Sequence, residues 1–231
     1  MHIFDIDILL PDLWAILGAV PRTLVMALTI FIFSTIIGSL FALIEQRRMP
    51  VLREFVLSYK VAFKGMPMVV VVFLAYYGLP IAFQFLADLV GLKVNAHRMP
   101  NEVTLILALI ACVATFQAEV VKGALNSFDT GQADAAYSLG YKNSQLLRRV
   151  LLPQVVVAAI PDLANSFMVI MKALSLGFAI EVVDIFAQSQ LTAALNYYYL
   201  QAFLIAVVIY MVLAYLVTRL ADRTERALRV W

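Results

Sequence analysis

Residues 24–44 read LVMALTIFIFSTIIGSLFALI, an uncharged stretch that meets the roughly 20 residues needed to cross the hydrocarbon core of a bilayer. The rest of the chain has the same character, since 64% of its 231 residues are hydrophobic and only 14% are charged. The mean hydropathy is +0.93. A soluble domain of this length could not cover so much apolar surface. We therefore predict an all-α membrane protein with a single membrane domain over residues 1–231.

Five membrane-spanning helices are predicted when the chain is read in windows of about 19 residues. They cover residues 24–44, 66–87, 103–118, 155–180 and 197–218. The third is short, so its helix either carries Glu119 in its last turns or stops before it. The preceding segment, residues 1–20, alternates apolar and acidic positions around Trp14. This pattern is typical of an amphipathic helix, which we expect to lie in the outer membrane interface.

The basic residues predict how these spans are oriented. Lys and Arg gather in residues 45–65, in residues 119–153 and in the tail from residue 219 onward. Cytoplasmic segments carry such an excess, so all three are expected inside the cell. With five spans, the N-terminus then lies outside and the C-terminus in the cytoplasm. The small net charge of +2, without a continuous basic stripe, argues against a nucleic-acid partner.

The long connection after the third span has an unusual sequence. Residues 131–153 read GQADAAYSLGYKNSQLLRRVLLP. Asp134 can favour the start of a helix, and Gly140 can end it. Between them, the small Ala135 and Ala136 allow another surface to approach closely. We predict a short helix parallel to the membrane on its cytoplasmic side.

This stretch resembles the loop found in permease subunits of ATP-binding-cassette importers, which reads E-A-A, three residues, G, nine residues, I-x-L-P. The matching positions are Asp134, Ala135, Ala136, Gly140, Val150, Leu152 and Pro153. Asp in place of Glu keeps the charge, and Val in place of Ile keeps the apolar character. The resemblance implies the type I importer permease (MetI-like) fold. It also implies that residues 131–153, Gly131 included, couple this chain to an ATPase.

Other positions resemble the polar amino-acid branch of that family, its histidine- and cystine-type permeases. They include Lys64-Gly65-Met66-Pro67, Tyr76-Tyr77-Gly78-Leu79-Pro80, Glu119, Lys122-Gly123, Pro161, Asn165, Lys172, Ser175 and Leu176. Departures occur at Lys64, at Met66 and at Ala173-Leu174, where that branch commonly has Arg, Thr and Asp-Thr. The resemblance implies a polar amino acid as the substrate, with L-cystine preferred from the similarity of the first two spans.

The chain contains no G-x-x-x-x-G-K-[ST] motif for binding nucleotide phosphates. We therefore expect no enzymatic activity and no cofactor in this chain, with ATP and Mg held by a separate ATPase. Five helices enclose too little space for a solute path, which predicts a second permease subunit, identical or related. The resemblance further implies two ATP-binding subunits, an extracytoplasmic solute-binding protein, a place in the bacterial inner membrane, and alternating access.

A polar stripe runs along the fourth span. Asp162, Asn165, Ser166, Val169 and Lys172 fall within an arc of about 120° on a helix that turns 100° per residue. Charged groups in a bilayer cost at least about 2.5–3.5 kcal/mol each, so they need a reason to be there. We predict that this stripe faces a cavity or the axis between two permease subunits. There Asp162 or Glu119 would receive an ammonium group, Lys172 a carboxylate, and Asn165 either.

Structural roles are open for several of these residues. Lys172 could form an internal ion pair with an acid, and Glu119 could pair with Lys122 or reach the membrane edge. Tyr76 and Tyr77 could line the passage or serve as packing and interface anchors. The two histidines, His2 and His97, lie far apart without a nearby Cys, so no metal site is expected.

Two other classes of protein compete with the importer subunit. An intramembrane enzyme could use buried acids such as Asp162 and Glu119, although one acid on each of two helices is a weak protease signal. A channel or secondary transporter would move solute without ATP, but it would have no use for the motif in residues 131–153.

Overall fold

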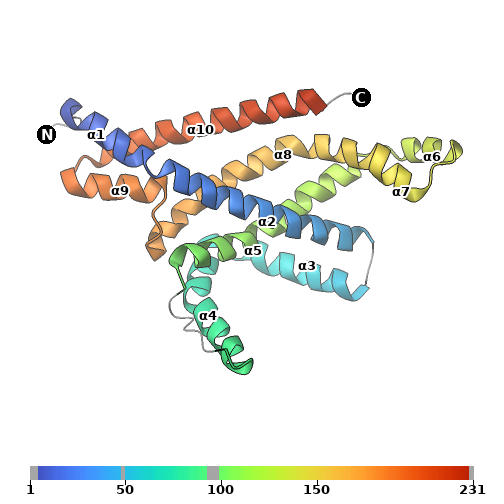
Figure 1. Ribbon diagram of the computed structural model, residues 1–231, viewed down its shortest axis with the longest axis horizontal. Helices are drawn as coiled ribbons and strands as arrows, with labels where there is room; N and C mark the ends of the chain where they lie inside the picture. The colour runs from blue at the N-terminus through green and yellow to red at the C-terminus, as the bar shows by residue number, and fades with distance from the viewer. Residues whose placement is uncertain (1–4, 48–49, 93–98, 229–231) are drawn as a thin grey trace.

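The computed structural model describes residues 5–47, 50–92 and 99–228, and these ranges are almost entirely helical (Figure 1). The helices are α1 (Ile6–Leu17), α2 (Val20–Gln46), α3 (Pro50–Gly65), α4 (Met68–Leu89), α5 (Asn101–Asn126), α6 (Thr130–Ser138), α7 (Asn143–Leu146), α8 (Leu152–Ala173), α9 (Ile185–Asn196) and α10 (Tyr199–Leu228). A π-helical turn, Leu147–Leu151, leads into α8, and a 3-10 helix, Leu174–Ile180, follows it.

The predicted five membrane spans are confirmed, because five stretches are long and apolar enough to cross a bilayer. They are Ile6–Gln46, Met68–Leu89, Asn101–Asn126, Asn143–Ile180 and Tyr199–Leu228. The first is longer than predicted because α1 runs almost directly into α2. The third is also longer, since α5 continues past Ala118 and holds Glu119 within the helix rather than beyond its end.

The basic segment between the first two spans contains a helix, α3, for which no structure was predicted from the sequence. Pro50 opens α3 at a first-turn position, where its missing N–H is not needed. Tyr59 connects α3 to α5, since its hydroxyl donates a hydrogen bond to the carbonyl oxygen of Ala111 at 3.0 Å. Its ring also packs on Phe41 of α2 and on Phe63. The segment therefore packs against two spans as an ordered part of the bundle.

α5 lies at the centre of the bundle and is the most buried of the five spans. It crosses α2 closely at Gly38, as the blue and green helices in Figure 1 show. A Cβ at this position would lie 2.6 Å from the Cβ of Gln117 and 2.7 Å from the backbone nitrogen of Ala118. Only glycine therefore allows these two helices to pack at this distance.

α1 occupies the segment where we predicted an amphipathic helix, although residues 1–4 lie outside the described part. Its side chains Ile6, Leu10 and Trp14 are exposed, whereas Asp12 is buried. The Asp12 carboxylate accepts hydrogen bonds from Asn196 at 3.1 Å and from Gln201 at 3.1 Å, which fixes α1 against α9 and α10. The location of this helix in the outer interface stays a prediction.

The short helix predicted in the connection after α5 is present as α6. It starts earlier than expected, because Asp129 rather than Asp134 caps it by accepting from the backbone N–H of Gly131 at 2.9 Å. Gly131 therefore lies in its first turn. The helix ends before Gly140, as predicted, since Gly140 has a φ of +80°, a conformation that glycine adopts without strain.

We predict that Gly38→Ala lowers the thermal stability of the protein. Its new Cβ must push α2 away from α5, and overpacking of this kind costs about 1–3 kcal/mol. The control is Gly78→Ala in α4, where a Cβ would meet no heavy atom within 4 Å. Melting followed by size-exclusion fluorescence should show a lower Tm for Gly38→Ala only, and equal Tm values would contradict the steric argument.

Candidate functional site

A cavity of about 490 Å³ lies between α8, α5 and the start of α4, a volume typical of small-molecule sites. Its lining residues are Met68, Val113, Phe116, Glu119, Val120, Asp162, Asn165, Ser166 and Val169. The predicted polar stripe of α8 thus meets Glu119 of α5 at one cavity. The residues of this set come from separate helices, so only packing of the bundle brings them together.

The α8 wall of this cavity carries two open polar groups. Asp162 and Asn165 are exposed one turn apart, and Ser166 beside them is buried. Within the described residues, neither the Asp162 carboxylate nor the Asn165 amide forms a side-chain hydrogen bond or ion pair. Both groups are exposed on the cavity wall and are therefore available to a polar ligand.

The opposite wall differs because its carboxylate is already bound. Lys60 and Lys64 of α3 each place their Nζ 2.8 Å from Oε1 of Glu119. Lys60 also pairs with Glu45 of α2, whose Oε2 accepts from Lys122 at 2.6 Å. We call these five residues the lysine–glutamate network. The alternative in which Glu119 pairs with Lys122 is wrong, because Lys122 pairs with Glu45 instead.

Sequence reasoning did not find the buried half of this network. The side chains of Lys60 and Glu45 are only 7% and 4% exposed, yet both lie in the charged segment 45–65, for which the sequence predicted only a cytoplasmic location. Burial lowers the pKa of the Lys60 ammonium, but the hydrogen bonds and charges of Glu119 and Glu45 outweigh it, so the pKa lies above its usual range. Lys60 therefore carries its positive charge throughout the physiological pH range.

The remaining predicted pathway residues lie away from this cavity. Lys172 is exposed near the end of α8, and within the described residues its ammonium forms no ion pair, so the internal pair considered from the sequence is not formed. Tyr76 packs against the core, and its ring meets that of the exposed Tyr77 edge to face at 5.0 Å. Roles for these three residues in transport stay predictions.

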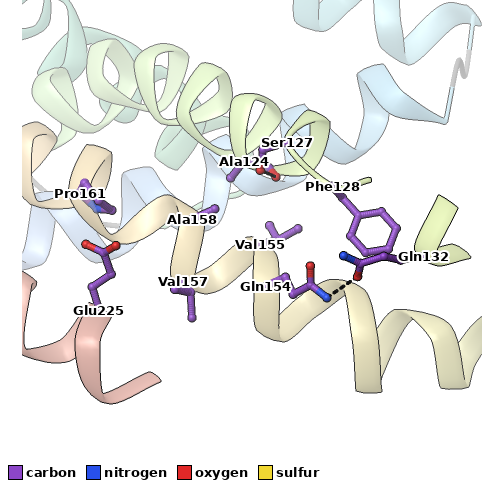
Figure 2. Close-up of a pocket in the computed structure, with 10 residues that line it drawn as sticks. All are labelled: Ala124, Ser127, Phe128, Gln132, Gln154, Val155, Val157, Ala158, Pro161 and Glu225. Atoms are coloured by element: carbon purple, nitrogen blue, oxygen red, sulfur yellow. Dashed lines mark hydrogen bonds between the residues drawn. The ribbon is translucent and has the colours of Figure 1, made fainter. Parts of the chain in front are cut away.

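A second cavity, of about 460 Å³, lies where α6 meets α8 (Figure 2). It is bounded by the end of α5, by α6, by the first turns of α8 and by Glu225 of α10. The Nε2 of Gln154 on α8 donates to Oε1 of Gln132 on α6 at 2.7 Å, as Figure 2 shows. This bond joins α6 to the helix that carries Asp162 and Asn165.

The predicted coupling residues surround this junction. Ala136 is buried, whereas Asp134 and Ala135 are exposed on the outer surface of α6. Pro153 lies in the first turn of α8, where proline is tolerated. Gly131 and Gly140 lie at the two ends of α6. α6 is therefore a compact helix with a surface of small residues open to a partner.

The sequence of this chain matches a known protein family. Residues 34–230 match the family described as binding-protein-dependent transport system inner membrane component. The probable amino-acid permease protein YxeN of Bacillus subtilis is 34% identical over 228 residues, which cover 99% of this chain and 97% of YxeN. The L-cystine transport system permease protein TcyL of the same organism is 27% identical over 213 residues, covering 92% and 87%.

A solved structure supports the fold. The chain resembles one in a crystal structure of an amino acid ABC transporter with a TM-score of 0.81 and 24% identity, covering 98% of this chain and 100% of that one. The predicted type I importer permease (MetI-like) fold is thereby confirmed.

We predict that Lys60→Met destabilises the protein more than Lys122→Met does. Both variants remove one ammonium from the same network, but Lys60 is buried between two carboxylates and Lys122 is 44% exposed. Losing a buried charged hydrogen-bond partner costs about 1–3 kcal/mol, and losing an exposed pair costs about 1 kcal/mol or less. Equal falls in Tm for the purified variants would show that burial of the network contributes nothing.

Proposed function

The chain belongs to the family of binding-protein-dependent transport system inner membrane components, and we propose that it is the permease subunit of an ATP-driven importer that carries a polar amino acid into the bacterial cell. It would lie in the inner membrane as a multi-pass protein, with its N-terminus outside and its C-terminus in the cytoplasm. The three basic segments support this orientation, because the end of α2, the start of α3, α6 and the end of α10 lie toward the same end of the molecule (Figure 1).

This proposal rests on two polar side chains of α8 that have no side-chain partner within the described residues. Asp162 and Asn165 line a cavity whose other wall is Glu119, and the helix that bears them is bonded to α6 through Gln154. A ligand in the cavity and a force on α6 would therefore act on the same helix. This arrangement suits a permease in which a distant motor changes access to a binding site.

The polar groups also indicate a class of substrate. A small molecule that carries an ammonium group and a hydrogen-bonding group would satisfy the carboxylate of Asp162 and the amide of Asn165. An amino acid offers both, and the cavity of about 490 Å³ has room for one. Similarity to the L-cystine permease supports L-cystine as the first candidate to test.

Transport in this proposal needs partners. A second permease subunit, identical or related, would complete the solute path, and two ATP-binding subunits would hold ATP and Mg. An extracytoplasmic solute-binding protein would deliver the amino acid. The exposed Asp134 and Ala135 on α6 offer the surface on which an ATP-binding subunit would dock. Closure of the ATPase pair would then move α6 as a rigid unit and, through α8, switch the cavity between inward-facing and outward-facing states.

The geometry disfavours the two competing classes. A catalytic pair of acids would need Asp162 and Glu119 to share a proton or a water molecule, but two lysine ammonium groups already hold Glu119. An ATP-independent transporter would gain nothing from a helix that presents small residues to a partner. Relatives named as permeases agree with a transport role in which this chain performs no catalysis.

We predict that Asp162→Asn lowers ATP-dependent uptake of the transported amino acid at least about tenfold, because a charge-assisted hydrogen bond to the ammonium is lost. The assay is uptake of labelled L-cystine and other polar amino acids by proteoliposomes that contain the whole transporter. The control is Asp222→Asn, the same chemical change on α10, away from the cavity. Similar uptake by both variants would exclude Asp162 as a substrate contact.

We predict that Ala135→Arg abolishes ATP-dependent uptake, because a long charged side chain would stand on the exposed face of α6 that the ATPase is proposed to contact. Gly140→Val should act through the backbone, since a φ of +80° costs a β-branched residue about 1–2 kcal/mol. Ala227→Arg, the same change on the exposed end of α10, is the control. ATPase co-purification and uptake that stay unchanged in Ala135→Arg would contradict the coupling role.

A further inference from the structure

Lys64 occupies a position at the edge of the cavity that would suit a ligand's ammonium group. Its Nζ lies 2.8 Å from Oε1 of Glu119 and 6.0 Å from the ring centroid of Phe116. Glu119 and Phe116 both line the cavity. A carboxylate beside an aromatic face is a favourable environment for an ammonium ion. The protein thus places one of its own ammonium groups in a cation subsite.

The two lysines on Glu119 are held very differently. Lys60 is 7% exposed and pairs with both Glu45 and Glu119, so its departure would break two ion pairs, one of them with a buried carboxylate. Lys64 is 33% exposed and has Glu119 as its only acidic partner among the described residues. Its departure would break one partly solvated ion pair, and such pairs contribute little to stability. Lys60 would keep the Glu119 carboxylate in place while Lys64 moves.

Exchange of one ammonium for another also preserves the charge balance of the network. If a cation arrives as Lys64 leaves, Glu119 keeps two ammonium partners, and no unpaired charge is left inside the bundle. A solute without an ammonium group cannot make this exchange. The displaced Lys64 has a long flexible stem by which its head can reach water.

From this geometry we propose that Lys64 is a built-in occupant of an ammonium subsite formed by Glu119 and Phe116, and that the ammonium group of the amino acid displaces it. Lys64 is then a specificity-determining residue that admits solutes able to replace it. This inference rests on the proposed function and adds a second contact, opposite Asp162, for a substrate with an ammonium group.

Lys122 provides a matched comparison. It belongs to the same lysine–glutamate network and is exposed to a similar extent, 44% against 33% for Lys64. Its Nζ bonds Oε2 of Glu45, however, and among the described residues Lys122 contacts neither Glu119 nor Phe116, the two cavity residues that Lys64 contacts. Lys64→Met and Lys122→Met therefore remove the same charge from the same network, and only the first empties the proposed subsite.

The experiment measures ligand binding to the whole transporter in lipid nanodiscs. L-Cystine and the other polar L-amino acids are screened on the wild type, and the tightest binder is then tested in two blocked forms. Its methyl ester keeps the ammonium group and loses the carboxylate, whereas its N-acetyl form does the reverse. Lys64→Met should lower the Kd of the methyl ester roughly fivefold and should not tighten the N-acetyl form. Lys64→Arg and Lys122→Met should keep the wild-type Kd for the methyl ester within about twofold.

Other results would overturn the inference. It fails if Lys64→Met and Lys122→Met change the Kd of the methyl ester equally, or if the N-acetyl form gains as much as the ester. Melting and size exclusion report whether each variant folds, and Lys64→Gln is a second neutral replacement. Misfolding of both neutral variants would assign Lys64 a purely structural role. A wild-type transporter that neither binds nor takes up any amino acid would refute the proposed function itself, and this is seen before any variant is made.

Discussion

The pairing of charges inside an apolar bundle is the interaction on which the rest of this structure depends. Glu45 and Glu119 project from two membrane spans, where an unpaired carboxylate would be costly. Lysines from α3 neutralise both, which binds α3 to α2 and α5 and turns a charged segment into part of the bundle. The same lysines hold Glu119 at the edge of the cavity. One network thereby stabilises the packing and sets the charge that a solute would meet.

α8 links the two functional regions of the chain. Its middle carries Asp162 and Asn165 on the cavity wall, and its first turns carry Gln154, which bonds α6. Gln154 and Asp162 lie on one continuous helix, in which Pro161 removes one backbone hydrogen bond between them. A chain that receives force at α6 therefore has a direct mechanical route to the cavity.

Much of this arrangement could be predicted from local patterns. Apolar length identified the spans, and helical periodicity placed Asp162, Asn165 and Ser166 on one face of α8. Gly140 ends α6 because a positive φ is a local property of the residue. The cap of α6 was misplaced, since Asp129 competes with Asp134 for the same role and the patterns of both are alike. Lys172 was included in the stripe because its angle is correct, but it does not line the cavity, whose lining on α8 ends at Val169.

The sequence by itself determined that the protein is a five-span helical membrane protein, where the short helix α6 ends, and which face of α8 is polar. These features depend on the hydropathy of neighbouring residues and on backbone preferences. Only the tertiary structure decided which lysines meet which glutamates, since the partners lie 55 and 77 residues apart. It also decided that Gly38 must be glycine, because that constraint comes from α5 pressing on α2. Contacts between distant segments follow from how helices pack in three dimensions, and no periodicity along the chain encodes them.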